Sequence, residues 1–130
     1  MSNLVLVDSS FYITHLTQRR QPFETLDKLV ERYDFAVCGI VWMEVLRGRS
    51  NPAVRAFFDE RFATMHFLNL TPAGWRRAAG LAWEMDRRGE IIPATDLAIA
   101  ACAIEHGATV LTFDKHFRNV PGIVAIDQLL

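Results

Sequence analysis

Four acidic residues occupy comparable positions along the chain, each beyond an expected strand or near the start of an expected helix. Carboxylates that converge in a fold repel one another and raise each other's pKa, so such a group needs a cation or protons. Oxygen ligands with no histidine or cysteine among them suit Mg²⁺ or Mn²⁺, which also bind substrate phosphate. One or two such ions could activate water and stabilise the leaving oxygen of a phosphodiester. The four residues are Asp8, Glu44, Asp96 and Asp114.

The stretch from Pro93 to Phe117 carries two of these acids and predicts a helix that runs into a strand. Gly107 ends the expected helix, and the apolar, partly β-branched run 108–113 is typical of a short buried strand. Asp96 lies in the first turn of the helix, and Asp114 lies just beyond the strand. The apolar positions of the helix, which follow helical spacing, are Leu97, Ala100, Ala101 and Ile104.

The other two acids follow the same arrangement. Asp8 comes after the apolar run 4–7 and opens an N-cap cluster with the two serines that follow it. Glu44 lies in an expected helix over 41–48 that follows a second buried strand, 35–40. Further helices are expected over 23–33, 51–64 and 71–88, and further strands over 65–70 and 122–126.

The strands are continuous apolar runs that alternate with helices, which predicts a single α/β domain over residues 1–130. Its parallel sheet would be covered by helices on both faces. Ligands bind such sheets at the carboxyl ends of the strands, where the strand order reverses. If the first and fourth strands are neighbours, all four carboxylates therefore point into one crevice.

Composition sets the limits of this interpretation. A chain of 130 residues with 51% hydrophobic content can bury a full core, and its net charge of −1 argues against broad, non-specific duplex binding. Cys38 and Cys102 have apolar neighbours and no C-x-x-C spacing, which predicts free buried thiols in a reducing compartment. The N-terminal apolar run ends at Asp8, too early for a signal peptide or a membrane span. We expect a cytoplasmic protein with no membrane association.

Each acid also has an ordinary structural explanation when it is taken singly. Asp8 could only cap its helix, Asp96 could only complement a helix dipole, and Asp114 could only open a turn. Glu44 could pair with Arg47 on a solvated face. The joint placement of the four acids is what favours a metal site.

Two further expectations concern the histidines and the aromatic residues. A lone histidine at a helix start is usually structural, so His116 is left out of the catalytic set. Several large apolar side chains exceed what so small a domain is expected to bury, and they predict a partner surface. They are Trp42, Leu46, Phe57, Phe58 and Phe62.

Four segments in order carry a resemblance to a known family: VLVDSS, WMEVLRG, DLAIAACA and TFDKHF. Over its whole length the sequence resembles a PIN-domain ribonuclease, and within that family the VapC-type toxin of a toxin–antitoxin pair. The resemblance implies a three-layer sandwich with a central parallel sheet of four to five strands. It also implies a type II toxin that is a Mg²⁺- or Mn²⁺-dependent endoribonuclease and cleaves single-stranded or loop RNA.

The resemblance assigns roles to the residues as well. All four acids of the family's metal site are present: the three aspartates would ligate the metal directly, and Glu44 would ligate it or orient the attacking water. Ser9 and Thr112 match small hydroxyl residues that would hold waters or carboxylates beside the metal ligands.

The implied partners are RNA, a second copy of the chain in a homodimer, and a cognate VapB-type antitoxin. The antitoxin's C-terminal segment would lie across the helices near the site, with a basic side chain reaching the acids. Two alternatives remain open. One is a PIN nuclease that acts in RNA processing outside any toxin pair, and the other is a non-catalytic PIN-like module that binds a partner through its helices.

Overall fold

A five-stranded, fully parallel sheet forms the centre of the protein in the computed structural model, which describes residues 3–129. The strands lie in the order β3-β2-β1-β4-β5. This order reverses between β1 and β4, which are hydrogen-bonded neighbours with Val7 opposite Leu111. The strands are β1 (Leu4–Val7), β2 (Asp34–Cys38), β3 (His66–Leu68), β4 (Thr109–Leu111) and β5 (Ala125–Ile126).

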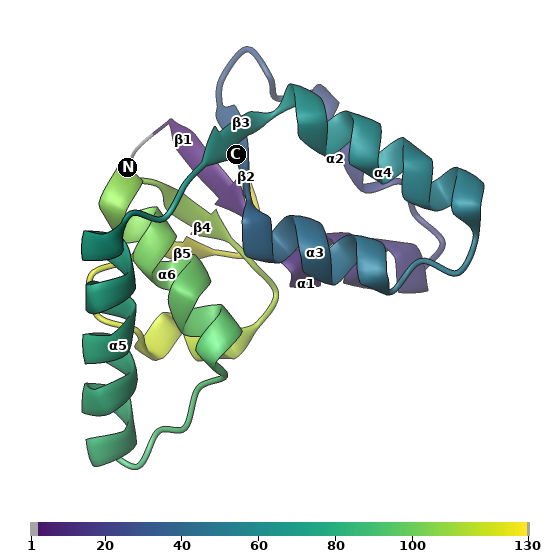
Figure 1. Cartoon of the computed structure of the whole chain (residues 1–130). Helices are drawn as coiled ribbons and strands as arrows, with labels where there is room; N and C mark the ends of the chain where they lie inside the picture. Colours follow the sequence, from purple (N-terminus) through teal and green to yellow (C-terminus); the bar gives the residue numbers. More distant parts are fainter. Residues whose placement is uncertain (1–2, 130) are drawn as a thin grey trace.

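Six α-helices and one 3₁₀ helix connect these strands within the described range. Right-handed crossovers in this order place the first four helices on one face of the sheet and the last two on the other. Figure 1 shows α5 and α6 together on the left and α2 and α4 together at the upper right. The helices are α1 (Ser9–Thr17), α2 (Pro22–Asp27), α3 (Gly39–Arg47), α4 (Pro52–Thr64), α5 (Pro72–Arg87), α6 (Ala94–His106) and η1 (Lys115–Asn119). The expected fold class, an α/β three-layer sandwich around a parallel sheet, is confirmed.

Local sequence signals account for where the helices begin and end. The Asn51 side chain accepts hydrogen bonds from the first backbone N–H groups of α4, and Thr71 caps α5 in the same way. A proline follows each cap, at a position where its missing N–H has no intrahelical partner. Gly107 ends α6 with a φ of 66°, a left-handed conformation that glycine adopts without strain.

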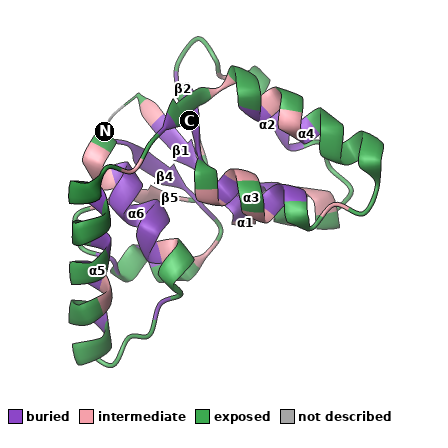
Figure 2. Cartoon of the chain, viewed as in Figure 1, coloured by how far each residue is buried: buried purple, intermediate pink, exposed green. Residues whose placement is uncertain are grey.

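The core lies between the sheet and its helices. The inner strands β1, β2 and β4 are buried almost throughout, and so is α6 from residue 97 to residue 103. Figure 2 shows this burial continuing along the inner side of α5, while its outer side faces solvent. Burial on both faces explains why the strands read as continuous apolar runs.

The strands after β1 are shorter than the sequence predicts, and two helices differ more clearly from the prediction. The helix expected over 23–33 ends at Asp27, because Leu29 N–H bonds to the Leu26 carbonyl and Arg32 N–H bonds to the Leu29 carbonyl. These are i→i+3 bonds, which turn the chain more tightly than an α-helix does. The helix η1 was not predicted. It begins directly after Asp114, whose side chain accepts the His116 N–H.

The prediction that five large apolar side chains would be left for a partner surface is wrong for three of them. Leu46, Phe58 and Phe62 are buried in this chain, while Phe57 is 38% exposed. Phe58 and Phe62 on α4 contact Tyr12 of α1 and Phe23 of α2, with ring centroids 5.2–6.3 Å apart. An aromatic cluster between these helices therefore buries Phe58 and Phe62 within this chain.

The helices are short compared with a bilayer. None within residues 3–129 is long and apolar enough to cross a membrane.

Candidate active site

The four acids come together at the carboxyl edge of the sheet, beside the point where the strand order reverses. Asp8 follows β1 directly, and Asp114 follows β4 after a short turn. Asp96 lies in the first turn of α6, and Glu44 lies within α3. Burial, followed by the charges of the other three acids, raises the pKa of Asp96 to about 7. All four carboxylates therefore share one electrostatic environment.

Asp8 is held firmly by one of its two carboxylate oxygens. Its Oδ2 atom accepts hydrogen bonds from Ser10 Oγ at 2.7 Å, Ser10 N at 3.3 Å and Thr112 Oγ1 at 2.8 Å. The Oδ1 atom has only a long 3.5 Å contact with Ser9 Oγ. Because the side chain is 3% exposed and fixed through Oδ2, Oδ1 retains lone pairs for another ligand.

Backbone groups complete the network around Asp8. Ser10 Oγ accepts the Phe113 N–H, and Thr112 Oγ1 accepts the Asp114 N–H, both at 2.9 Å. Each hydroxyl accepts one backbone proton and donates its own to Asp8, so its orientation is fixed. This links the turn after β4 to the start of α1 and sets the distance between Asp8 and Asp114.

A hydrogen bond between α1 and α3 positions the Glu44 side chain. Ser9 Oγ donates to Glu44 Oε1 at 2.7 Å, and Ser9 itself is 6% exposed. The alternative explanation for Glu44 was an ion pair with Arg47. The ion pairs among the described residues do not include one between these two side chains. The carboxylate of Glu44 instead faces the other acids, where its charge contributes to the raised pKa of Asp96.

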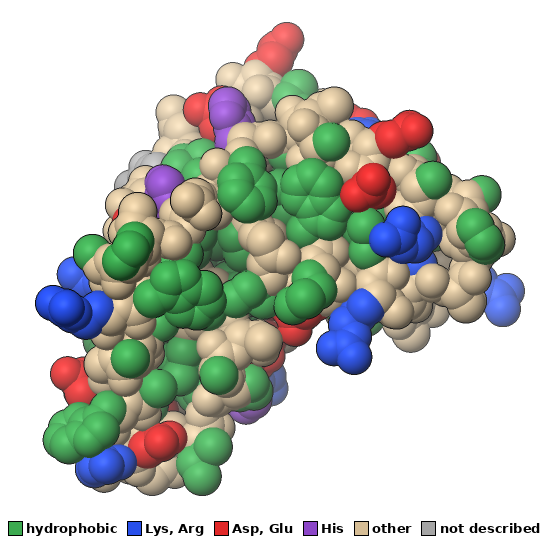
Figure 3. All heavy atoms as spheres, viewed as in Figure 1, with side chains coloured by type: hydrophobic (Ala, Val, Ile, Leu, Met, Phe, Trp, Pro, Cys, Tyr) green, Lys and Arg blue, Asp and Glu red, His purple; other side chains and the backbone are tan. Residues whose placement is uncertain are grey.

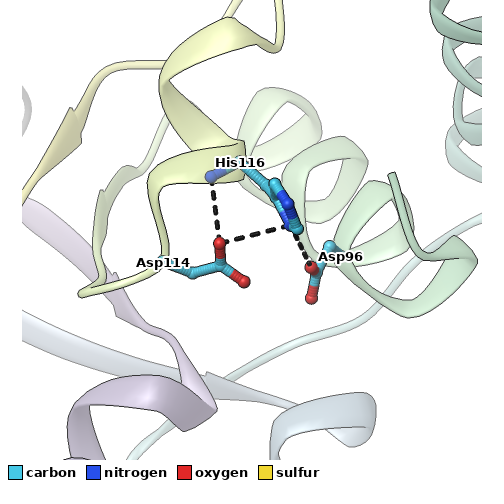
Figure 4. Close-up of side chains that lie close together, drawn as sticks. All are labelled: Asp96, Asp114 and His116. Atoms are coloured by element: carbon cyan, nitrogen blue, oxygen red, sulfur yellow. Dashed lines mark hydrogen bonds and ion pairs between the residues drawn. The ribbon is translucent and has the colours of Figure 1, made fainter. Parts of the chain in front are cut away.

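His116 lies beside the two remaining acids, as Figure 4 shows. Its Nδ1 atom is 3.3 Å from Asp114 Oδ1 and 3.9 Å from Asp96 Oδ2. The ligand atoms of these three residues lie within 4.8 Å of one another. Asp114 Oδ1 also accepts the His116 N–H at 2.9 Å, so the turn that caps η1 brings the ring back over the carboxylate.

Sequence reasoning named Ser9 and Thr112 but missed Ser10 and His116. An aspartate that bonds the backbone N–H two residues later is a common turn, which brings the backbone of His116 close to Asp114, but the sequence does not give the direction of its ring. Ser10 gave a weaker signal as the last member of an N-cap cluster. Its bond to the Phe113 N–H depends on the pairing of β1 with β4.

The donor set fits a divalent cation. Asp96 and Asp114 offer hard oxygen ligands close to each other and to the His116 ring, and the charges of Asp8 and Glu44 also act on Asp96. Together with burial, this repulsion disfavours full ionisation without a cation.

Residues 5–123 match the PIN domain family, and the chain belongs to that family. Within it, the chain is similar to the Ribonuclease VapC21 of Mycobacterium tuberculosis, with 30% identity over 127 residues that cover 95% of this chain and 90% of the relative. This match places it with the VapC-type members, as the resemblance in the sequence implied.

Solved structures share the fold. VapBC2 from Rickettsia felis, bound to a DNA fragment from its promoter, matches with a TM-score of 0.79 and 19% identity, covering 95% of this chain and 97% of that one. VapC20 from Mycobacterium tuberculosis, a sarcin–ricin loop cleaving toxin, matches with a TM-score of 0.67 and 17% identity, covering 92% and 96%.

Proposed function

We propose that this protein is an endoribonuclease that depends on Mg²⁺ or Mn²⁺ and cleaves single-stranded or loop RNA as the toxin of a type II toxin–antitoxin pair. The observation that carries the proposal is the convergence of carboxylates from four segments: burial of Asp96, and then the charges of Asp8, Asp114 and Glu44, raise its pKa to about 7. The likeness to Ribonuclease VapC21 supports the choice of RNA. A cytoplasmic location goes with such a substrate.

The roles of the residues follow from their surroundings. Asp8, Asp96 and Asp114 would hold the metal, which when bound supplies charge to a phosphodiester and lowers the pKa of a water. Glu44, held at Oε1 by Ser9, keeps Oε2 to orient the attacking water and accept its proton. Ser10 and Thr112 keep Asp8 fixed in one orientation, so no rearrangement is needed when substrate binds.

The proposed partners are a cognate VapB-type antitoxin and a second copy of this chain. Structures with the same fold, from Rickettsia felis, Haemophilus influenzae and other bacteria, are described as VapBC or toxin–antitoxin complexes. A short reading frame overlapping the start of this gene would distinguish a toxin pair from an RNA-processing nuclease.

The test is RNA cleavage by the purified protein with Mn²⁺, Mg²⁺ or EDTA. The variants Asp8→Asn and Asp96→Asn are expected to lose activity by about 100-fold or more, while remaining folded by circular dichroism. Asp86→Asn, on the exposed side of α5, is the matched control and should cleave like the wild type. Full activity in Asp8→Asn would rule out this site.

Metal binding is tested separately by calorimetry with Mn²⁺. The wild type should bind the ion, and Asp96→Asn should bind it at least about tenfold more weakly because one ligand is lost. A wild type without specific Mn²⁺ uptake would favour a non-catalytic PIN-like module instead.

A further inference from the structure

His116 lies beside two of the candidate metal ligands, but the proposed function gives it no role. Its Nδ1 atom is 3.3 Å from Asp114 Oδ1 and 3.9 Å from Asp96 Oδ2. Figure 4 shows the ring between the two carboxylates, which come from η1's cap and from α6. The ring therefore joins two acids that are far apart along the chain.

The backbone of His116 is fixed, while its ring keeps some freedom. Asp114 Oδ1 accepts the His116 N–H at 2.9 Å, and the next residue, Phe117, is 1% exposed and anchors η1 in the core. The His116 side chain is 54% exposed, against 15% for Asp96 and 31% for Asp114. The ring can therefore shift by a few tenths of an ångström without disturbing the core.

The three side chains are spaced like the ligands of one ion. Their ligand atoms, one nitrogen and two carboxylate oxygens, all lie within 4.8 Å of one another. An ion with bonds of about 2.1 Å holds neighbouring ligand atoms about 3.0–3.4 Å apart. The separation of Nδ1 from Asp114 Oδ1 lies in this range, and its separation from Asp96 Oδ2 exceeds the range by about 0.5 Å.

The nitrogen that faces the acids is not used in a hydrogen bond. The side-chain hydrogen bonds within residues 3–129 include none made by His116 Nδ1. In a neutral imidazole with its hydrogen on Nε2, Nδ1 has a lone pair in the plane of the ring, and this lone pair can bind a metal ion. A ring that served only as a cation beside the acids would instead compete with a metal ion. The two roles have opposite effects on metal affinity.

We propose that His116 is a ligand of the metal ion through Nδ1, and that this nitrogen makes the site prefer Mn²⁺ to Mg²⁺. Mg²⁺ takes oxygen ligands, whereas Mn²⁺ suits carboxylates and, as a transition-metal ion, also accepts an imidazole nitrogen. The inference rests on the proposed function, because Asp96 and Asp114 would hold the same ion. It adds a ligand from outside the four acids and a reason for selectivity between the two ions.

The direct test is pulsed EPR of the full-length protein at saturating Mn²⁺, which detects nitrogen nuclei bound to the ion. The wild type is expected to show a ¹⁴N coupling that is replaced by a ¹⁵N coupling when its histidines are labelled. His116→Ala should lose the coupling. Bound Mn²⁺ without a nitrogen coupling in the wild type would overturn the proposal, and this result needs no substitution.

The matched control is His66→Gln, which should keep the nitrogen coupling of the wild type. His66 begins β3, so it lies at the edge of the sheet opposite the acids, and its side chain is 63% exposed. Figure 3 shows histidine side chains at the surface around β3, near the top of the view. Loss of the coupling in this control would contradict the assignment to His116.

Calorimetry with Mn²⁺ and with Mg²⁺ measures the preference. His116→Ala should bind Mn²⁺ about tenfold more weakly and Mg²⁺ less than about threefold more weakly, because the lost ligand is a nitrogen. Tighter Mn²⁺ binding by His116→Ala would show that the ring is a competing cation. Equal losses for the two ions would contradict the selectivity.

Asp96→Asn distinguishes a failure of this inference from a failure of the proposed function. If Asp96→Asn loses Mn²⁺ binding while His116→Ala binds the ion like the wild type, the acidic site stands and the role of His116 is overturned. A wild type that takes up no Mn²⁺ would overturn both. Circular dichroism checks that each variant is folded.

Discussion

Asp8 combines a structural and a chemical role, because its two oxygen atoms have different partners. Oδ2 is the N-cap acceptor of α1 and also binds the hydroxyls of Ser10 and Thr112, whereas Oδ1 is left for a ligand. The simple capping explanation and the metal-site explanation are therefore both compatible with this one side chain.

Removing the Thr112 hydroxyl tests this arrangement. In Thr112→Val, Asp8 Oδ2 loses a donor and the Asp114 N–H loses its acceptor, inside a site where Thr112 is 4% exposed. We expect a loss of about 1–3 kcal/mol in the free energy of unfolding and about a tenfold fall in RNA cleavage. Urea unfolding and the cleavage assay measure the two effects. Thr112→Ser keeps the hydroxyl and should recover most of both; failure to recover would mean that the methyl group, and not the hydrogen bonds, matters.

The crowding around Asp96 predicts a pH dependence of stability. Its pKa is about 7 in the folded protein, against an ordinary value of 3.8. Between these values the folded chain binds a proton that the unfolded chain has lost, so stability falls as pH rises from about 4 to 7. In EDTA, Asp96→Asn should flatten this dependence and stabilise the protein at pH 8 by roughly 1–2 kcal/mol, since water partly screens the site.

Thermal unfolding of the wild type, Asp96→Asn and the control Asp86→Asn across this pH range measures the effect. Mn²⁺ should raise the melting temperature of the wild type more at pH 8 than at pH 5, because the ion competes with the proton for the same carboxylate. A wild type whose stability rises steadily from pH 4 to 7 would contradict the crowding.

At the scale of elements, the acids and their strands could be predicted from the sequence. The hydrogen bonds that link one acid to the segment of another could not. Apolar runs marked β1, β2 and β4, and the acids followed from their positions at strand ends and helix starts. The hydrogen bonds from the Ser10 and Thr112 hydroxyls to Asp8 could not be predicted, because they depend on strand register. Val7 pairs with Leu111, and this pairing brings Asp8 level with Thr112. A shift by one residue would turn those side chains to opposite faces. Sequence patterns fix neither this register nor the turn that folds His116 back onto Asp114.

Two glycines in α5 provide a matched test of how the start of that helix packs against Glu105 of α6. A methyl group at Gly74 would meet the Glu105 carboxylate and Leu70, and Glu105 accepts the Thr71 N–H at 3.1 Å. Gly74→Ala should therefore displace Glu105 and cost about 1–2 kcal/mol. A methyl group added at Gly80 would have no neighbouring atom within 4 Å. Gly80→Ala should therefore raise the free energy of unfolding by up to about 1 kcal/mol through helix propensity. Chemical denaturation measures both, and equal stabilisation by the two substitutions would contradict the contact with Glu105.

At the scale of the whole molecule, the arm formed by α2 and α4 is joined to the sheet layer through aromatic rings. Phe58 is 1% exposed and contacts Tyr12 on α1 and Phe23 on α2, whereas its neighbour Phe57 is 38% exposed. Tyr12 belongs to the helix that Asp8 caps, so this cluster connects the arm to the candidate active site.

If the arm and the sheet fold as one unit, damage to the cluster should lower the stability of both. Phe58→Ala leaves a cavity among four rings and should cost about 3–5 kcal/mol, while Phe57→Ala should cost about 1 kcal/mol because its ring is partly in water already. Hydrogen exchange distinguishes the two cases. In Phe58→Ala, the amides of α4 and of β1 should lose protection by the same free energy, since one cooperative unfolding reaction exposes both. Loss of protection confined to α2 and α4 would show instead that the arm opens alone, and the four acids would then be held by the sheet without its help.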